Sequence, residues 1–201
     1  MGDIKKLKKK FERPKKPWEK DRIILEKELK KKYGYKNKKE IWRFNALLRG
    51  FRQQARIIFA STSNQMKKEG ENLLKSLYNM GLLEENGTFD DILGLSIDDI
   101  SKRRLVSMVL SKGLARTPKQ ARQFITHKQI MVNNKKISSP NYIVLRDGEN
   151  NISFADNSPF NDKHHPLIDA MNNISKKENQ IEIKSEKIVK ELKKEAQKNG
   201  E

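Results

Sequence analysis

The sequence predicts an α+β fold, in which a mainly helical N-terminal half precedes a small domain of two helices packed on a short antiparallel sheet. Apolar residues recur every three or four positions along much of the first half, which is the spacing of amphipathic helices. Short alternating apolar segments follow, separated by Asn and Gly residues that are typical of tight turns. We therefore expect four segments: an extended basic arm at 1–17, a helical domain at 18–95, a compact domain at 96–155 and a mobile extension at 156–201.

The segment 1–17 is rich in lysine, contains two prolines and has few apolar side chains. Because it buries too little apolar surface to fold alone, we expect an arm that becomes ordered only on a partner. In the helical domain, apolar spacing predicts helices over 18–33, 38–60 and 66–80. Gly50, inside the second of these, predicts either a bend or a close approach of another group to the backbone.

Two helix starts mark the compact domain. Ser96 and Asp99 have the spacing of a capping box and begin a helix that we expect over 97–112. Thr117 and Pro118 are typical residues for the N-cap and the first helical position, and they begin a second helix that extends to about residue 128.

The remainder of the compact domain is predicted to be a small sheet. Residues 130–137 alternate around an Asn133-Asn134 turn, and residues 143–154 alternate around Asp147-Gly148. Both patterns are typical of antiparallel strands joined by tight turns. Beyond residue 155 the pattern fades into a tail rich in Lys and Glu.

Charge is distributed unevenly along the chain, whose net charge is +18. Residues 1–60 carry 21 basic and 7 acidic side chains, residues 61–100 carry 3 and 8, residues 101–155 carry 11 and 2, and the rest carry 9 of each. Two basic blocks separated by an acidic one attract a polyanion, so the composition favours nucleic acid as the partner.

Composition and motifs also argue against several functions. No apolar run approaches the length of a membrane span and no apolar signal segment follows the charged N-terminus, so we expect a soluble, non-secreted chain without a membrane partner. The absence of cysteine excludes disulfides and thiolate metal sites, and the histidines, including His164-His165, show no metal-ligand spacing. No phosphate-binding loop or nucleophile elbow is present, so we expect no enzyme, cofactor, metal or small-molecule substrate.

A basic surface is expected on the compact domain. If its two helices pack their apolar faces on the sheet, the polar side chains left outside are almost uninterrupted by carboxylates and suit the phosphates and 2′-hydroxyls of A-form RNA. The exposed start of the second helix adds N–H groups for a phosphate. The candidate RNA-binding residues of this surface are Arg103, Arg104, Arg116, Thr117, Lys119, Gln120, Arg122, Gln123, His127, Lys128, Lys135 and Lys136.

A second set of candidates lies in the N-terminal half. Three arginines share one face of the predicted helix 38–60, although an ordinary solvated face is the alternative interpretation. Trp18 is a candidate either for stacking on a base or for packing, whereas Trp42 is expected in the core. The candidates in this half are Arg43, Arg49, Arg52, Gln53, Arg56, Lys5, Lys6, Lys8, Lys9, Lys10, Arg13, Lys15, Lys16 and Trp18.

The compact domain resembles the S4 RNA-binding domain. The resemblance is carried by Arg104-Leu105, Gly113-Leu114-Ala115, Thr117, Ala121-Arg122-Gln123, Ile125, His127, Ile130, Val132-Asn133 and Pro140-Asn141-Tyr142-Ile143-Val144. This chain departs from the pattern at Lys128-Gln129 and at Asn134, where glycine is usual, and at Val106, where bacterial forms carry Asp. Because Asn tolerates positive φ, we expect the turn at Asn134 to form nevertheless.

The N-terminal half, through WEKDRIILEKELKKKYGYKNKKEIWRFNALLRGFRQQAR, is similar to the archaeal and eukaryotic form of the ribosomal protein S4 family. That resemblance implies a cytoplasmic, ribosome-bound structural component of the small subunit. It also implies direct, early binding to small-subunit ribosomal RNA, contact with neighbouring ribosomal proteins, and a place near mRNA entry where decoding accuracy is tuned. The alternatives are an RNA-modifying or tRNA-charging enzyme with an appended S4 domain, and a stress-linked ribosome-binding factor, which lacks such an N-terminal half.

Overall fold

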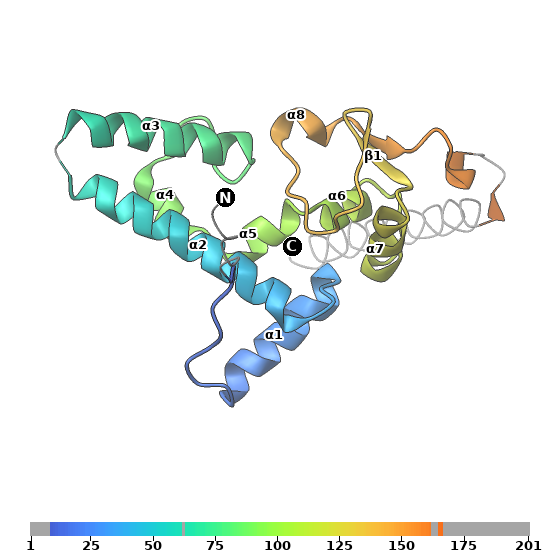
Figure 1. Cartoon of the computed structure of the whole chain (residues 1–201), viewed down its shortest axis with the longest axis horizontal. Coiled ribbons are helices and arrows are strands. Elements are labelled where there is room, and N and C mark those ends of the chain that lie inside the picture. The colour runs from blue at the N-terminus through green and yellow to red at the C-terminus, as the bar shows by residue number, and fades with distance from the viewer. Residues whose placement is uncertain (1–8, 62, 162–164, 167–201) are drawn as a thin grey trace, which may run out of the picture. The chain divides into compact units, whose positions relative to one another are not determined.

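The computed structural model of the chain describes residues 9–61, 63–161, 165 and 166. It divides into two compact units, residues 1–155 and residues 156–201, each described here by itself. The second unit contributes a short 3-10 helix, η1 (Pro159–Asn161), and the predicted tail beyond residue 166 lies outside the described residues. The first unit carries all the remaining helices and strands of the described part and confirms the α+β class (Figure 1).

The three helices expected in the N-terminal half are present as α1 (Lys20–Tyr33), α2 (Lys38–Phe59) and α3 (Asn64–Asn79). Helix α2 contacts both of the others, and α3 runs back along it (Figure 1). A further short helix that the spacing did not predict, α4 (Phe89–Gly94), begins with a capping box between Thr88 and Asp91. Helix α2 continues through Gly50, and a Cβ built there would meet no atom within 4 Å, so no group of the described chain approaches the backbone closely at this position.

The single helix expected over 97–112 is two helices, α5 (Ile97–Lys102) and α6 (Leu105–Ser111). The helix is interrupted between them because the backbone of residues 103–105 pairs with that of residues 142–144. The carbonyl of Arg103 accepts a hydrogen bond from the amide of Val144 at 3.0 Å, and the amide of Leu105 donates to the carbonyl of Tyr142 at 2.8 Å. Helix α7 (Pro118–Thr126) follows, as the Thr-Pro start predicted.

The sheet has three antiparallel strands in the order β2-β1-β3: β1 (Ile130–Val132), β2 (Lys135–Lys136) and β3 (Ile152–Phe154). The hairpin between β1 and β2 turns through Asn133 and Asn134, whose φ angles of 49° and 60° are those of a tight hairpin turn. The turn therefore forms with Asn in place of Gly, as expected.

The strand expected near 143–145 is not part of this sheet. Ile143 instead forms an isolated bridge with Arg104, and the predicted turn at Asp147-Gly148 lies within the helical turn α8 (Arg146–Glu149). Gly148 is buried against β1, where an added Cβ would lie 2.9 Å from Cγ1 of Val132. Close packing of α8 on the sheet therefore replaces the predicted strand.

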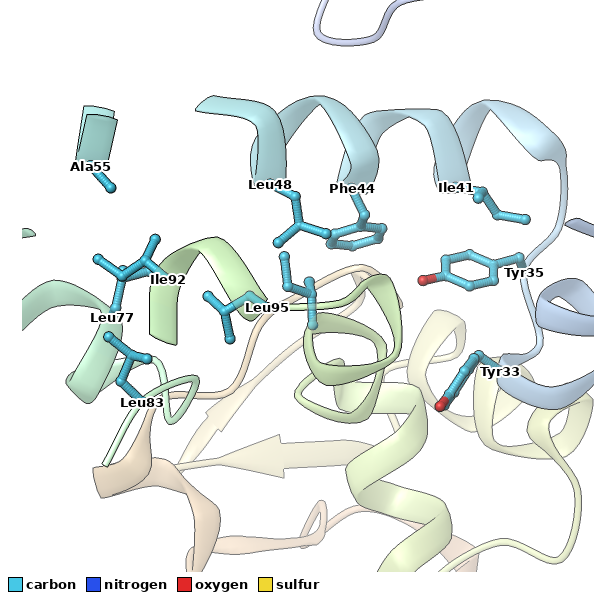
Figure 2. Packing of buried hydrophobic residues seen from close by; sticks show 11 residues of the cluster. Tyr33, Tyr35, Ile41, Phe44, Leu48, Ala55, Leu77, Leu83, Ile92 and Leu95 are labelled. Atoms are coloured by element: carbon cyan, nitrogen blue, oxygen red, sulfur yellow. The ribbon is translucent and has the colours of Figure 1, made fainter. Parts of the chain in front are cut away.

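Helix α2 supplies the centre of the core. Its buried side chains Phe44 and Leu48 face Tyr35 and Leu95 (Figure 2). The same cluster includes Tyr33, Ile41, Ala55, Leu77, Leu83, Ile92 and Ile100. Phe59, which continues the apolar spacing of α2, lies outside the core with 78% of its surface exposed. In the described part of the chain, no helix combines the length and the apolar character that a bilayer crossing requires.

Candidate nucleic-acid interface

Helix α7 is the centre of the candidate surface on the compact domain. Its apolar residues Ala121, Phe124 and Ile125 are buried, so Lys119 and Gln123, four residues apart, lie on the opposite, exposed side.

The start of α7 is capped by its own side chains. The hydroxyl of Thr117 accepts from the amide of Gln120 at 3.2 Å, and the side-chain oxygen of Gln120 accepts from the amide of Arg116 at 3.0 Å. Two of the N–H groups near this helix start are thus already satisfied, so a phosphate would find fewer free donors here than the sequence suggested.

The cations around α7 and the β1–β2 hairpin are exposed. Strand β2 consists of two exposed lysines, and Lys128 follows α7 in a left-handed conformation with φ of 58°. Within the described residues these side chains form no salt bridge. The exposed, unpaired members of the predicted set are Arg116, Lys119, His127, Lys128, Lys135 and Lys136.

Lys112 belongs with these cations although it was not among the predicted residues. It is exposed at the end of α6 and forms no salt bridge within the described part. Its position between a helix end and Gly113, in a block almost free of acids, was the signal available in the sequence.

Arg122 is turned inward and not toward the solvent. Its Nη2 lies 2.8 Å from Oε1 of Glu40, and its Nη1 lies 3.2 Å from Oε2 of the same carboxylate. Burial alone would raise the pKa of Glu40, but the hydrogen bond from Arg122 and the bond from the Lys36 amide outweigh it, so this pKa is lowered. The expectation that Arg122 lies on the outer, almost carboxylate-free surface is therefore wrong.

Arg104 was expected on the outer surface, and this is also wrong because its side chain is 0% exposed. It donates to the carbonyl of Tyr33 at 3.1 Å and to Oδ1 of Asn141 at 2.7 Å. Its guanidinium carbon lies 3.9 Å from the centre of the Tyr35 ring. Arg104 therefore holds the core together and cannot reach an RNA in this conformation.

The side chain of Arg103 is mostly buried, and both terminal nitrogens of its guanidinium are hydrogen-bonded within the domain. It donates to Oε2 of Glu149 at 2.8 Å and to the carbonyl of Val144 at 3.1 Å. These contacts join the α5–α6 break to α8, and they leave little of the guanidinium free for a phosphate.

The arginine face of α2 is only partly free. Arg49 pairs with Glu12, and Arg52 donates to the carbonyl of Leu95. Arg43, Gln53 and Arg56 are exposed, although Arg56 also donates to the backbone of its own helix at 3.2 Å.

The described part of the basic arm, residues 9–17, lies against α2 even without a partner. The ring of Phe11 is centred 6.2 Å from that of Trp42, and Glu12 forms its pair with Arg49. The candidates Lys9, Lys10, Arg13, Lys15, Lys16 and Trp18 are exposed, whereas Lys5, Lys6 and Lys8 lie outside the described residues. Trp42 is half-buried, and its Nε1 donates to Glu26 at 2.9 Å.

The described residues contain no group of three or more His, Asp or Glu side chains placed to hold a metal ion.

A family model described as the S4 domain matches residues 103–149, the span from the α5–α6 break to α8. Together with the two-helix and three-strand arrangement, the match defines a protein of the S4-domain class.

Similarity extends beyond this domain. The chain is 48% identical over 167 residues to small ribosomal subunit protein uS4 of Methanococcus aeolicus. The aligned region covers 83% of this chain and 94% of the relative. It is 44% identical over 183 residues to the uS4 protein of Picrophilus torridus, covering 90% and 100%, and 45% identical over 160 residues to that of Ignicoccus hospitalis, covering 80% and 96%. The chain belongs to the uS4 family of small ribosomal subunit proteins. This membership confirms the predicted resemblance and the expectation that the chain is not an enzyme.

Proposed function

We propose that the chain is a structural component of the small ribosomal subunit that binds small-subunit ribosomal RNA through exposed cations in both basic blocks. The observation that carries the proposal is the exposed set around α7 and β2, which forms no ion pair within the described residues. Such cations release condensed counterions when they neutralise phosphates, and this supplies affinity for RNA.

The geometry of the set supports RNA over an acidic protein. The cations stand on or beside a short helix and a two-residue strand that belong to a packed domain, so the backbone positions that carry them have a fixed spacing. Phosphates of a folded RNA also have fixed spacing, and contacts to them set orientation on the RNA. Arg104 and Arg122 do not contribute directly; they hold the N-terminal helices to this domain.

A salt titration of RNA binding tests the proposal. Arg116→Ala with Lys119→Ala should weaken binding to small-subunit ribosomal RNA and reduce the slope of log affinity against log salt by up to about two, because each phosphate contact contributes about 0.9. Lys67→Ala with Lys68→Ala removes the same charge from exposed positions on α3, in the acidic block, and should change both quantities less. Equal effects of the two double substitutions would contradict the proposed surface.

The proposal includes the place of the chain in the ribosome. We infer early binding during subunit assembly, contacts with neighbouring ribosomal proteins, a location near mRNA entry in the cytoplasmic ribosome and an influence on decoding accuracy. The support is the family relationship together with two separate basic blocks in one packed unit, which let one protein join distant RNA segments. Omitting the protein from a stepwise reconstitution should stall assembly early, and normal assembly without it would contradict this role.

A further inference from the structure

We propose that Trp18 is a stacking platform for an unpaired base of the bound RNA. The inference rests on the proposed function and assigns one element of recognition within it. Trp18 is 90% exposed, the most exposed of the large apolar side chains in the described part. The indole therefore contributes almost nothing to the core, and its flat faces are free.

The side chain of Arg22 holds in place the turn that carries Trp18. Nη2 of Arg22 donates to the carbonyls of Lys16 and Pro17 at 3.0 and 2.8 Å, while Nη1 of the same side chain donates to Glu26.

Glu26 is itself a fixed anchor for this arrangement. It is buried, accepts from Nε1 of Trp42 at 2.9 Å and lies 3.2 Å from Nζ of Lys38. Burial alone would raise the pKa of Glu26, but hydrogen bonds from Trp42, Arg22 and Lys38 lower it, so the anchor stays ionised at neutral pH. The backbone beside Trp18 is thus pre-organised, which reduces the entropy lost when a ring stacks on it.

The charges around Trp18 favour a nucleotide over an apolar pocket on a protein. Lys15, Lys16 and Lys20 are exposed and form no salt bridge within the described residues, whereas the neighbouring Glu19 lies 3.7 Å from Arg22. Asp21 is the one exposed carboxylate beside them without such a pair. An aromatic ring between lysines can stack on a base while the lysines contact the phosphates of the same strand.

The base must be unpaired. Within an RNA duplex both faces of each base are already covered by its neighbours, and a protein ring reaches a base only in loops, bulges or ends. The structure therefore assigns to Trp18 a single-stranded or bulged nucleotide, while the cations around α7 and β2 suit the phosphates of folded RNA.

Tryptophan fluorescence provides a direct test, because the chain contains two Trp residues and Trp18→Phe removes the emission of Trp18 while it keeps Trp42, whose Nε1 donates to Glu26. Titration with small-subunit ribosomal RNA should quench the emission of the native chain more than that of Trp18→Phe, and a fully paired RNA duplex of equal length should quench the native chain less. Equal quenching of the two proteins on saturation with ribosomal RNA would overturn the inference.

Affinity measurements separate stacking from other contacts. In the otherwise native chain, Trp18→Ala should weaken binding to small-subunit ribosomal RNA by about 5- to 150-fold, the range for loss of one base stack, with an unchanged salt slope. Trp18→Phe should retain most of the affinity, whereas Trp18→Leu, which keeps apolar bulk but has no π face, should bind as weakly as Trp18→Ala. Phe59→Ala is the matched control, because Phe59 is an exposed aromatic outside the lysine cluster, and it should not change the affinity.

Each other outcome has a defined meaning. If Trp18→Leu binds as well as Trp18→Phe, the side chain makes an apolar contact and the stacking inference is wrong. If the native chain binds the RNA and Trp18→Ala binds equally well, this inference fails while the proposed function stands. If the native chain does not bind ribosomal RNA at modest salt, the proposed function fails and this inference fails with it.

Discussion

The guanidinium of Arg104 lies over the ring of Tyr35 and beside that of Phe44, with its carbon 3.9 and 5.5 Å from the two ring centres. Its nitrogens donate hydrogen bonds to the carbonyl of Tyr33 and to the side-chain oxygen of Asn141. Oε2 of Glu40 lies 4.0 Å from its Nη2. Burial lowers the pKa of Arg104, while Tyr35 and Glu40 favour the charged form. Arginine nonetheless remains charged at all ordinary pH values, so the core holds a cation that must keep all of its partners.

Replacement of this side chain should therefore act on stability. We expect Arg104→Ala to lower the free energy of unfolding by about 3–5 kcal/mol, because it leaves Tyr33 and Asn141 without a donor and opens a cavity in the core. Arg116→Ala, at an exposed position in the same domain, should change it by less than about 0.5 kcal/mol. Urea unfolding followed by circular dichroism measures both. A small effect at Arg104 would show that the core repacks without the cation.

The elements that the sequence predicted correctly are those whose signals are local. Thr117 and Pro118 mark the start of α7, Ser96 and Asp99 mark the start of α5, and the three-four spacing marks α2. The break after α5 and the loss of the strand near Ile143 were not predictable in this way. Both depend on the backbone pairing of residues 103–105 with 142–144, which are far apart in the sequence.

In the candidate site too, features with local sequence signals were predicted and those set by distant contacts were not. Exposed Lys119 and half-buried Arg122 both stand in an acid-poor block, and nothing nearby in the sequence separates them. The partner that withdraws Arg122 from the surface, Glu40, is 82 residues away along the chain. Composition therefore predicted a basic surface, while contacts between segments far apart in the chain decide which cations remain available.

Two glycines, one inside α2 and one at the end of α1, make a matched test at the scale of the element. Gly50 lies in regular helix with open space around it, so Gly50→Ala should raise the free energy of unfolding by roughly 0.5–1 kcal/mol by restricting the unfolded chain. Gly34, just before α2, has φ of 65°, and a Cβ there would lie 2.6 Å from Cβ of Pro118. Gly34→Ala should therefore lower that free energy by more than about 1 kcal/mol. Thermal unfolding compares the two, and equal shifts of the same sign would contradict this account.

At the scale of the whole unit, the N-terminal helices and the S4 domain are joined by specific polar contacts. The hydroxyl of Tyr33 donates to Oδ1 of Asp98 at 2.7 Å, Gly34 lies against Pro118, and Glu40 accepts from Arg122. The two basic blocks of the sequence therefore belong to one folded unit. An RNA that binds both must match their fixed separation, which is how shape is recognised without reading base sequence.

The carboxylate of Glu40 links this junction to pH. Its pKa is lowered in the folded chain from an ordinary value of 4.5, so the stability that it contributes is present above about pH 4.5 and is lost as pH falls through the folded pKa. Glu40→Gln should lower the free energy of unfolding at pH 7 by about 1–3 kcal/mol, because a neutral amide replaces a charged partner of Arg122. The same variant should lose less stability than the native chain between pH 7 and pH 3.5, since it has no proton to gain at this site. Urea unfolding at a series of pH values checks both effects. Parallel stability curves for the two proteins would mean that other carboxylates, such as Glu26, govern the acid response and that the α2–α7 junction is insensitive to protonation.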